Sequence, residues 1–190
     1  MQTDAIVSRP RYAPLSPGRA RWNLLVAQRT SFIQDAVADG VSEKDFNEIW
    51  HIESDVSALP DPACADKGFR SRSHLFIALK RRLDLEKIGL RLFAAGDEAF
   101  VWDVYALGRS GGLGTQEISV FAPYFGARRV ICVHCRSYTD DCKSTIATCS
   151  GCGAALLVRD HFSKRLNAYQ GFQIDAEEPG AVPKGEPFTS

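Results

Sequence analysis

Apolar residues in the first two thirds of the chain form short continuous runs and longer periodic stretches. The runs at residues 21–28 and 90–96 are mainly apolar and too short for helices, so they predict buried strands. Residues 48–53 alternate apolar and polar side chains, which favours a strand, although residues 42–45 just upstream resemble a helix capping box. Residues 117–125 predict the last strand of this part of the chain.

Three stretches between these strands have the periodicity of amphipathic helices. The first begins at residue 30, where Thr30 or Ser31 is placed to cap it and Gly40 to end it. The second spans 73–89, and the third spans 97–112 and begins with acidic residues, which suit the helix dipole. The predicted inward faces are Phe32, Ile33, Ala36 and Val37 in the first helix, Leu75, Ala78, Leu79 and Leu83 in the second, and Phe100, Val101, Val104 and Leu107 in the third.

The alternation of strands and helices predicts βαβ units on a parallel sheet. Right-handed connections would then give a three-layer α/β domain over residues 20–127, with a small Rossmann-like fold.

Residues 1–19 contain several prolines and predict an extended arm. Residues 55–69, with Pro60, Pro62 and Gly68, predict a loop.

The composition is that of a soluble globular chain, and it narrows the functional classes. Of 190 residues, 45% are apolar and 24% are charged, and 23 basic residues balance 23 acidic ones, which weakens nucleic-acid binding as a function. No apolar run approaches the ~18 residues of a membrane span. The first residues include Asp4 and lack the apolar core of a secretory signal, so we expect a cytoplasmic protein without a membrane partner.

Five of the six cysteines lie in the stretch CVHCRSYTDDCKSTIATCSGCG at residues 132–153. Two Cys-x-x-Cys pairs, Cys132 with Cys135 and Cys149 with Cys152, are separated by 13 residues, which is enough for two short strands and a turn. In a reducing compartment such pairs favour a tetrahedral metal site over disulfides. We therefore predict a zinc ribbon, rubredoxin-like, over residues 128–172, with iron as the alternative metal because four thiolates accept either ion.

Four thiolates would close the metal's coordination shell, so we expect a structural metal and assign no catalytic residue. Cys142 lies midway between the pairs and is predicted to be a free surface thiol at a hairpin tip. Cys64 is remote and is interpreted as structural or incidental. His134, between the first two cysteines, should point away from the metal. An iron site would instead make the module an electron carrier.

Residues 90–125 resemble the end of the nucleotide-binding module of ferredoxin reductase-type flavoenzymes. The resemblance rests on a strand, a helix, a glycine-containing turn and a final strand ending in an aromatic residue. This chain has Ala95-Gly96-Asp97 where that family has Cys-Gly-Pro, and VAQRTSF at residues 26–32 has no glycine to cradle a phosphate. We therefore assign no cofactor-binding residue and expect independent hydride chemistry to have been lost.

A second resemblance covers most of the chain and is most distinctive over residues 128–183. RRVICVHC, TCSGCGAALLVRDHFSKRLNAYQGF and DAEEPG are similar to the small subunit of bacterial dimethylamine monooxygenase and its relatives. The resemblance implies a subunit of an N-demethylase that uses NADPH and O₂. It places haem, flavin, iron–sulfur and NADPH chemistry on partner oxygenase and reductase subunits, which this chain would organise.

The segment after the last cysteine interleaves aromatic and basic side chains, a combination that interfaces enrich. The alternatives are a strand that packs on the ribbon and a surface for single-stranded nucleic acid, although residues 128–190 hold only eight basic against seven acidic residues. Residues 173–190, acidic and rich in proline and glycine, predict an extended tail. The predicted partner-binding residues are Arg159, His161, Phe162, Arg165, Tyr169 and Phe172.

Overall fold

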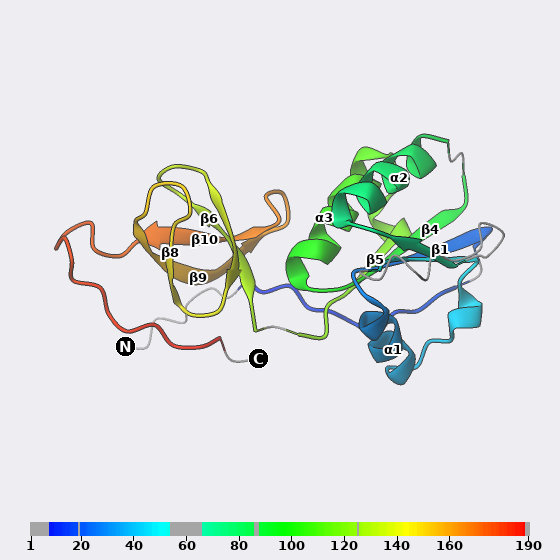
Figure 1. Ribbon diagram of the computed structural model, residues 1–190, viewed down its shortest axis with the longest axis horizontal. Coiled ribbons are helices and arrows are strands. Elements are labelled where there is room, and N and C mark those ends of the chain that lie inside the picture. The colour runs from blue at the N-terminus through cyan, green and yellow to red at the C-terminus, as the bar shows by residue number, and fades with distance from the viewer. Residues whose placement is uncertain (1–7, 19, 54–65, 86–87, 125, 189–190) are drawn as a thin grey trace. The chain divides into compact units, whose positions relative to one another are not determined.

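The computed structural model describes residues 8–18, 20–53, 66–85, 88–124 and 126–188. The chain divides into two compact units, one α/β and one all-β (Figure 1). The α/β unit is the continuous stretch Tyr12–Pro123, whereas the β unit combines Met1–Arg11 with Tyr124–Ser190. The chain therefore passes from one unit to the other twice.

Five parallel strands form the sheet of the α/β unit, in the order β3-β2-β1-β4-β5. The parallel sheet predicted from the apolar runs is thus confirmed. The central strands β1 and β4 are buried along almost their whole length, because helices cover both faces of the sheet. The strands are β1 (Trp22–Ala27), β2 (Glu48–Ile52), β3 (Asp66–Phe69), β4 (Leu90–Ala95) and β5 (Ile118–Phe121).

Strand β3 lies where the sequence predicts a loop over residues 55–69. Residues 54–65 of that stretch lie outside the described residues, but Asp66–Phe69 pair in parallel with β2 at the edge of the sheet. The sequence of β3 is DKGF, which contains one large apolar residue, and no residue of the strand is fully buried. An edge strand of this kind has no apolar pattern from which it could be predicted. The loop prediction was therefore wrong for these four residues.

The helices α1 (Thr30–Ala38), α2 (Arg72–Leu85) and α3 (Glu98–Ser110) cover the sheet. Helix α1 lies on one face, and α2 and α3 lie together on the other (Figure 1). None of the helices in the described stretches combines the length and apolarity needed to cross a membrane. The core on the α1 side consists of Leu15, Leu25, Ala27, Phe32, Ile33, Ala36, Val41, Phe46, Ile49, Phe93, Ala95 and Phe121.

The ends of these elements differ in detail from the predictions. The residue that caps α1 is Arg29, which makes no side-chain capping bond, so capping by Thr30 or Ser31 was wrong. The capping box at residues 42–45 does form, but on a short 3₁₀ helix that leads into β2. Helix α2 is described only as far as Leu85, short of the predicted end at residue 89.

The β unit is a five-stranded sheet in the order β7-β6-β10-β9-β8. Strands β6 and β10 run parallel, and the other neighbours are antiparallel. The N-terminal arm joins this unit through a bridge between Ser8 and His161, and the tail joins it through a bridge between Ser144 and Pro187. The strands are β6 (Arg128–Cys132), β7 (Tyr138–Cys142), β8 (Ile146–Thr148), β9 (Ala155–Ser163) and β10 (Ala168–Gln173).

A buried arginine holds the two ends of the chain to the β unit. Arg128 is 5% exposed, and its guanidinium lies 4.3 Å from the ring centre of Tyr169 and 3.9 Å from that of Phe188 in the tail. It also donates to Asp160 at 2.7 Å, and the other oxygen of that carboxylate accepts from Arg9 at 2.7 Å. The pairing with Asp160 neutralises the buried guanidinium, and the two aromatic rings add cation–π contacts to it.

In the α/β unit, the carboxylate of Glu48 links three strands and a helix. It accepts from the indole N–H groups of Trp22 and Trp50, both at 2.9 Å, and from Lys67 at 3.2 Å, and it lies 3.7 Å from Arg82. Burial alone would raise the pKa of Glu48. The hydrogen bonds from Trp50 and Lys67, with the charges of Lys67 and Arg82, outweigh burial and lower that pKa below its ordinary value of 4.5.

We predict that Glu48→Gln lowers the free energy of unfolding by about 2 kcal/mol at pH 7, because charged donors lose their buried acceptor. The lowered pKa means that the ionised carboxylate stabilises the fold above the ordinary Glu pKa, and that this stabilisation is lost as the pH falls through the folded value. The difference between wild type and variant should therefore shrink below pH ~4. Urea titrations at pH 7 and at pH 3.5 measure it, and a difference that does not change with pH would contradict this role.

Candidate metal centre

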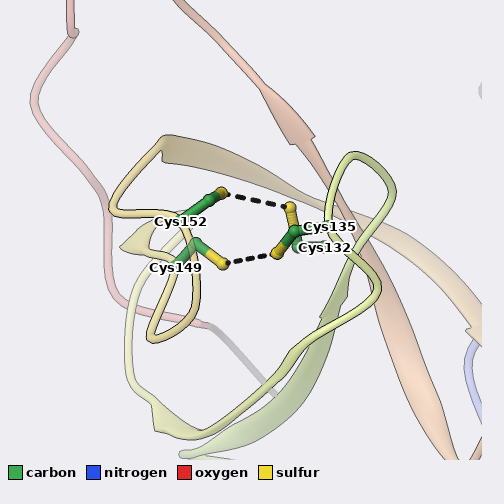
Figure 2. A group of neighbouring side chains, drawn as sticks. All are labelled: Cys132, Cys135, Cys149 and Cys152. Carbon is green, nitrogen blue, oxygen red and sulfur yellow. Dashed lines mark hydrogen bonds between the residues drawn. The ribbon is translucent and has the colours of Figure 1, made fainter.

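The two Cys-x-x-Cys pairs lie on two turns at the same end of the β unit (Figure 2). Cys132 ends β6, and the turn that follows returns the chain to β7, with the N–H of Arg136 donating to the carbonyl of Cys132. Cys149 follows β8, and the N–H of Gly153 donates back to its carbonyl before β9 begins. Each pair thus lies at a turn that connects two antiparallel strands, β6 with β7 and β8 with β9. The strand pairing and the turn's own hydrogen bond hold the backbone of each pair in place.

The four sulfurs are arranged as four ligands of one ion would be. The Sγ atoms of Cys132 and Cys152 are 3.9 Å apart, those of Cys135 and Cys149 are 3.5 Å apart, and all four lie within 4.8 Å of one another. Sulfurs bound at ~2.3 Å to a central zinc occupy tetrahedron corners about 3.8 Å apart. The separations are far longer than the ~2.05 Å of a disulfide. The cluster predicted from the spacing therefore forms, and it can hold a metal ion.

Two glycines shape the second turn, Gly151 by leaving space beside the sulfurs and Gly153 by its backbone conformation. A Cβ atom at Gly151 would lie 2.2 Å from the Ser137 hydroxyl and 3.2 Å from the sulfur of Cys135. Instead, the N–H of Gly151 approaches the sulfur of Cys149 at 3.4 Å. Gly153 has a φ of +74°, a conformation that side chains rarely adopt.

Hydroxyl groups hold the second turn to strand β7 independently of any ion. The N–H of Ser150 donates to the hydroxyl of Thr139 at 3.0 Å, and the Ser150 hydroxyl donates to the carbonyl of Tyr138 at 2.8 Å. These contacts join the second turn to β7. Thr139 and Ser150 were not predicted from the sequence, because serine and threonine close to cysteines are not distinctive without knowing which strand faces which turn.

The thiols of the cluster differ in acidity. Hydrogen bonds from the side chain and backbone of Ser137 lower the pKa of Cys135 to about 6. The backbone N–H groups of Cys152 and Gly151 lower the pKa of Cys149. The N–H of Ala154 lowers the pKa of Cys152, but burial and the neighbouring thiols outweigh it and raise that pKa to about 11. Four thiolates so close together repel one another, so full ionisation needs a cation between them.

Cys142 is buried, with 6% of its surface exposed, so the prediction of a free surface thiol was wrong. It ends β7, and its S–H donates to the carbonyl of Thr139 at 3.5 Å. Burial, together with the charges of Asp140 and Asp141, raises the pKa of Cys142 to about 11. The predicted hairpin is also absent from the described sheet, because β7 pairs with β6 and β8 pairs with β9.

The remaining cysteine and histidine add no ligand to the described cluster. His134 is exposed and is not among the four neighbouring ligand groups, as expected from its place in the first turn. Cys64 lies outside the described residues.

The predicted partner-binding segment divides into a buried and an exposed part. Phe162 and Tyr169 are 7% and 3% exposed and contact each other edge to face with ring centres 5.1 Å apart, so they belong to the core of the β unit and their assignment to a partner surface was wrong. Five strands, rather than a two-stranded ribbon, supply the core that takes them. Arg159, His161 and Arg165 are exposed, and Phe172 is half-buried beneath the Arg159 guanidinium, 4.9 Å from its ring centre.

Side chains of the α/β unit fill the point where its strand order reverses, between the carboxyl ends of β1 and β4. The amide of Gln28 donates to the carboxylate of Asp97 at 2.6 Å, and its oxygen accepts from the Asp97 N–H at 2.8 Å. Asp97 also caps α3 by accepting from the Phe100 N–H at 2.8 Å. In open α/β sheets this is the position where ligands bind. Here a carboxylate and an amide already occupy it.

Comparison with known proteins identifies relatives of this chain. Residues 129–172 match the family described as "Dimethylamine monooxygenase subunit DmmA-like, C-terminal domain". The chain is also 43% identical over 122 residues to the "Heme-dependent oxidative N-demethylase delta subunit" of Ectopseudomonas mendocina (strain ymp). That alignment covers 64% of this chain and 66% of the relative, just under two thirds of its length. These matches confirm the resemblance to the small-subunit family, and no solved structure matches the chain.

We predict that Cys149→Ser abolishes stoichiometric metal binding and destabilises the β unit. Losing one of four thiolates removes a ligand whose binding energy is also folding energy, about 10 kcal/mol for a structural zinc site. Metal content by plasma mass spectrometry and a thermal melt measure the two effects. One equivalent of metal retained by the variant would exclude Cys149 as a ligand.

The matched control is Cys142→Ser, which changes a nearby cysteine outside the cluster. We expect it to keep the full metal content, because Cys142 is not among the four neighbouring thiols. It should lower the melting temperature slightly, since a hydroxyl replaces a buried thiol.

Proposed function

Because residues 129–172 match the C-terminal domain of DmmA-like subunits, we propose that this chain is an accessory subunit of an N-demethylating monooxygenase that uses NADPH and O₂. The observation that carries the proposal is that the whole four-cysteine cluster lies inside the matched region. The name of the relative, a delta subunit of a haem-dependent oxidative N-demethylase, supports the same class of assembly. We propose dimethylamine as the substrate, converted to methylamine and formaldehyde, in the cytoplasm.

In this proposal the chain organises its partners and performs no redox step itself. Haem, flavin, iron–sulfur and NADPH belong to the oxygenase and reductase subunits. A metal held by Cys132, Cys135, Cys149 and Cys152 would have a closed coordination shell, which is typical of a structural site. Zinc bound there would fasten the two turns to each other and supply the cation that the crowded thiols need. We therefore regard residues 128–172 as a zinc ribbon.

Iron at the same cysteines would make the chain an electron carrier, because four thiolates bind either ion. The two possibilities differ in colour, since ferric thiolate sites absorb visible light and zinc thiolates do not. The absorption spectrum of the purified chain and its metal content decide between them.

The α/β unit is proposed to be a Rossmann-like domain whose nucleotide site no longer works. Its five parallel strands support the fold. The contact between Gln28 and Asp97 argues against a dinucleotide, because it places a carboxylate where strand order reverses and a pyrophosphate would be repelled. The turn after β1 also has a glutamine and an arginine where a glycine cradle belongs.

We accordingly predict that the isolated chain binds NADPH weakly, with a dissociation constant above roughly 10 μM. Isothermal titration calorimetry measures it. Gln28→Gly combined with Asp97→Gly should strengthen binding if the side-chain contact is what blocks the site. Tight binding by the unaltered chain would show that a working nucleotide site survives.

Reconstitution of the N-demethylase with and without this chain tests the proposed function. We expect the oxygenase and reductase subunits to co-purify with the chain, and the rate of NADPH-dependent formaldehyde release to fall when it is omitted. A full rate in its absence, with no co-purification, would refute the accessory role.

Within that assembly, Arg159→Ala, Arg165→Ala and Phe172→Ala should weaken co-purification while leaving the melting temperature nearly unchanged. Their side chains are exposed or half-buried, and arginine and aromatic residues are the usual hot spots of interfaces. Phe162→Ala is the matched control, because Phe162 is buried and its loss should lower the melting temperature instead. If none of the three surface variants weakens co-purification, this segment does not bind a partner subunit.

A further inference from the structure

The four thiols of the metal centre differ in how far solvent reaches them. Cys152 is exposed and Cys135 is half-buried, whereas Cys132 and Cys149 are 0% and 2% exposed. The sulfur of Cys152 lies 3.9 Å from that of Cys132, and the sulfur of Cys135 lies 3.5 Å from that of Cys149 (Figure 2). Each thiol that solvent reaches therefore has a buried thiol of the other turn beside it.

This pairing suits one thiol that reacts with an oxidant and a second thiol that completes the reaction. Hydrogen peroxide converts an accessible thiolate into a sulfenic acid, which condenses with a neighbouring thiol to form a disulfide. Because the sulfurs of a disulfide are ~2.05 Å apart, the two atoms of each cross-turn pair have less than about 2 Å to close. A thiol so near also intercepts the sulfenic acid before it is oxidised further.

Contacts that do not involve the ion keep the two turns next to each other. The N–H of Cys132 donates to the carbonyl of Ser137 at 3.0 Å, which closes the first turn where it enters β7. Ser150 of the second turn bonds to the hydroxyl of Thr139 and to the carbonyl of Tyr138, at the start of the same strand. The sulfur pairs therefore stay close enough to react when the ion leaves.

Cys142 is set apart from this chemistry, although it lies between the two pairs in the sequence. Its side chain is buried, and its S–H donates to the carbonyl of Thr139. An oxidant from solvent therefore reaches Cys152 and Cys135 more readily than Cys142. We expect Cys142 to stay reduced, which makes it an internal control.

We propose that the cysteine cluster is a reversible oxidation site, at which hydrogen peroxide replaces the ion by two cross-turn disulfides, Cys132–Cys152 and Cys135–Cys149. The inference rests on the proposed metal centre, because a bound ion deprotonates all its thiols and leaves access to solvent to select the first to react. That first thiol is Cys152. The proposed function also supplies the oxidant, since reduction of O₂ by two electrons gives hydrogen peroxide.

Each disulfide consumes one peroxide. The Cys152 thiolate attacks a peroxide oxygen, the O–O bond breaks, and a sulfenic acid forms as hydroxide leaves. The Cys132 thiolate then attacks the Cys152 sulfur, so that the S–S bond forms and the S–O bond breaks with loss of a second hydroxide. Two electrons pass from the two sulfurs to the peroxide, and two protons from solvent convert the hydroxides to water. Cys135 and Cys149 react with a second peroxide in the same way.

The test treats the full chain, loaded with one equivalent of Zn²⁺, with hydrogen peroxide. We expect the zinc to be lost, as measured with a zinc-binding dye, and two disulfides to form. Remaining thiols are alkylated before digestion with trypsin, which places the first cysteine pair, Cys142 and the second pair on separate peptides, residues 130–136, 137–143 and 144–159. Cross-turn disulfides join the first peptide to the third, and fragmentation by mass spectrometry identifies the bonded sulfurs.

The order of the bonds and their reversal test the roles of the individual thiols. With one equivalent of peroxide, Cys132–Cys152 should form before Cys135–Cys149, and the Cys142 peptide should be alkylated throughout. The oxidised chain should melt above the reduced, metal-free chain, because the cross-links hold the turns together in place of the ion. A dithiol reductant with fresh Zn²⁺ should restore the full metal content.

The other outcomes separate this inference from the proposals on which it rests. Zinc retained in excess peroxide, disulfides confined within each cysteine pair, or sulfinic acids in place of disulfides would each overturn the oxidation site. A chain that binds no stoichiometric zinc would overturn the metal centre and the oxidation site together. Failure of the chain to assemble with the oxygenase and reductase subunits would count against the proposed function alone, because the thiol chemistry is measured on the chain by itself.

Discussion

The crowding of four thiols within 4.8 Å of one another governs the design of the β unit. Two turns must be held face to face, and each is closed by its own backbone hydrogen bonds and by the antiparallel strands beside it. Thr139 and Ser150 add contacts that join the second turn to strand β7. A cation bound between the sulfurs, as proposed, would offset their mutual repulsion, and folding of this unit would then be coupled to metal binding.

In the α/β unit, side chains of the protein itself fill the position where such folds usually bind ligands. Gln28 and Asp97 satisfy each other's hydrogen bonds there, and Tyr12 from the N-terminal arm donates to Glu98 at 2.7 Å at the start of the same helix. The polar groups at this position therefore satisfy one another and hold chain segments of the α/β unit in place.

The sequence predicts those features of the fold and the cysteine cluster that depend on residues close together in the chain, and it misses those that depend on contacts between distant residues. Buried strands and amphipathic helices are repeated apolar patterns, and the cysteine pairs carry their own spacing, so both were recognisable. The burial of Tyr169 was not, because Arg128, whose guanidinium lies over its ring, comes from 41 residues earlier in the chain. Strand β3 was missed because its pairing with β2, rather than its composition, makes it a strand.

The two passages of the chain between the units bear on how the protein is made. The α/β unit is continuous in sequence, so it can fold on the ribosome as soon as residue 123 has emerged. The β unit needs Ser8 and Arg9 from the beginning of the chain and Phe188 from near its end. Ser8 and Arg9 therefore cannot pair until Asp160 and His161 of β9 have been synthesised. A segment translated 151 residues later thus determines when Arg9 finds its partner.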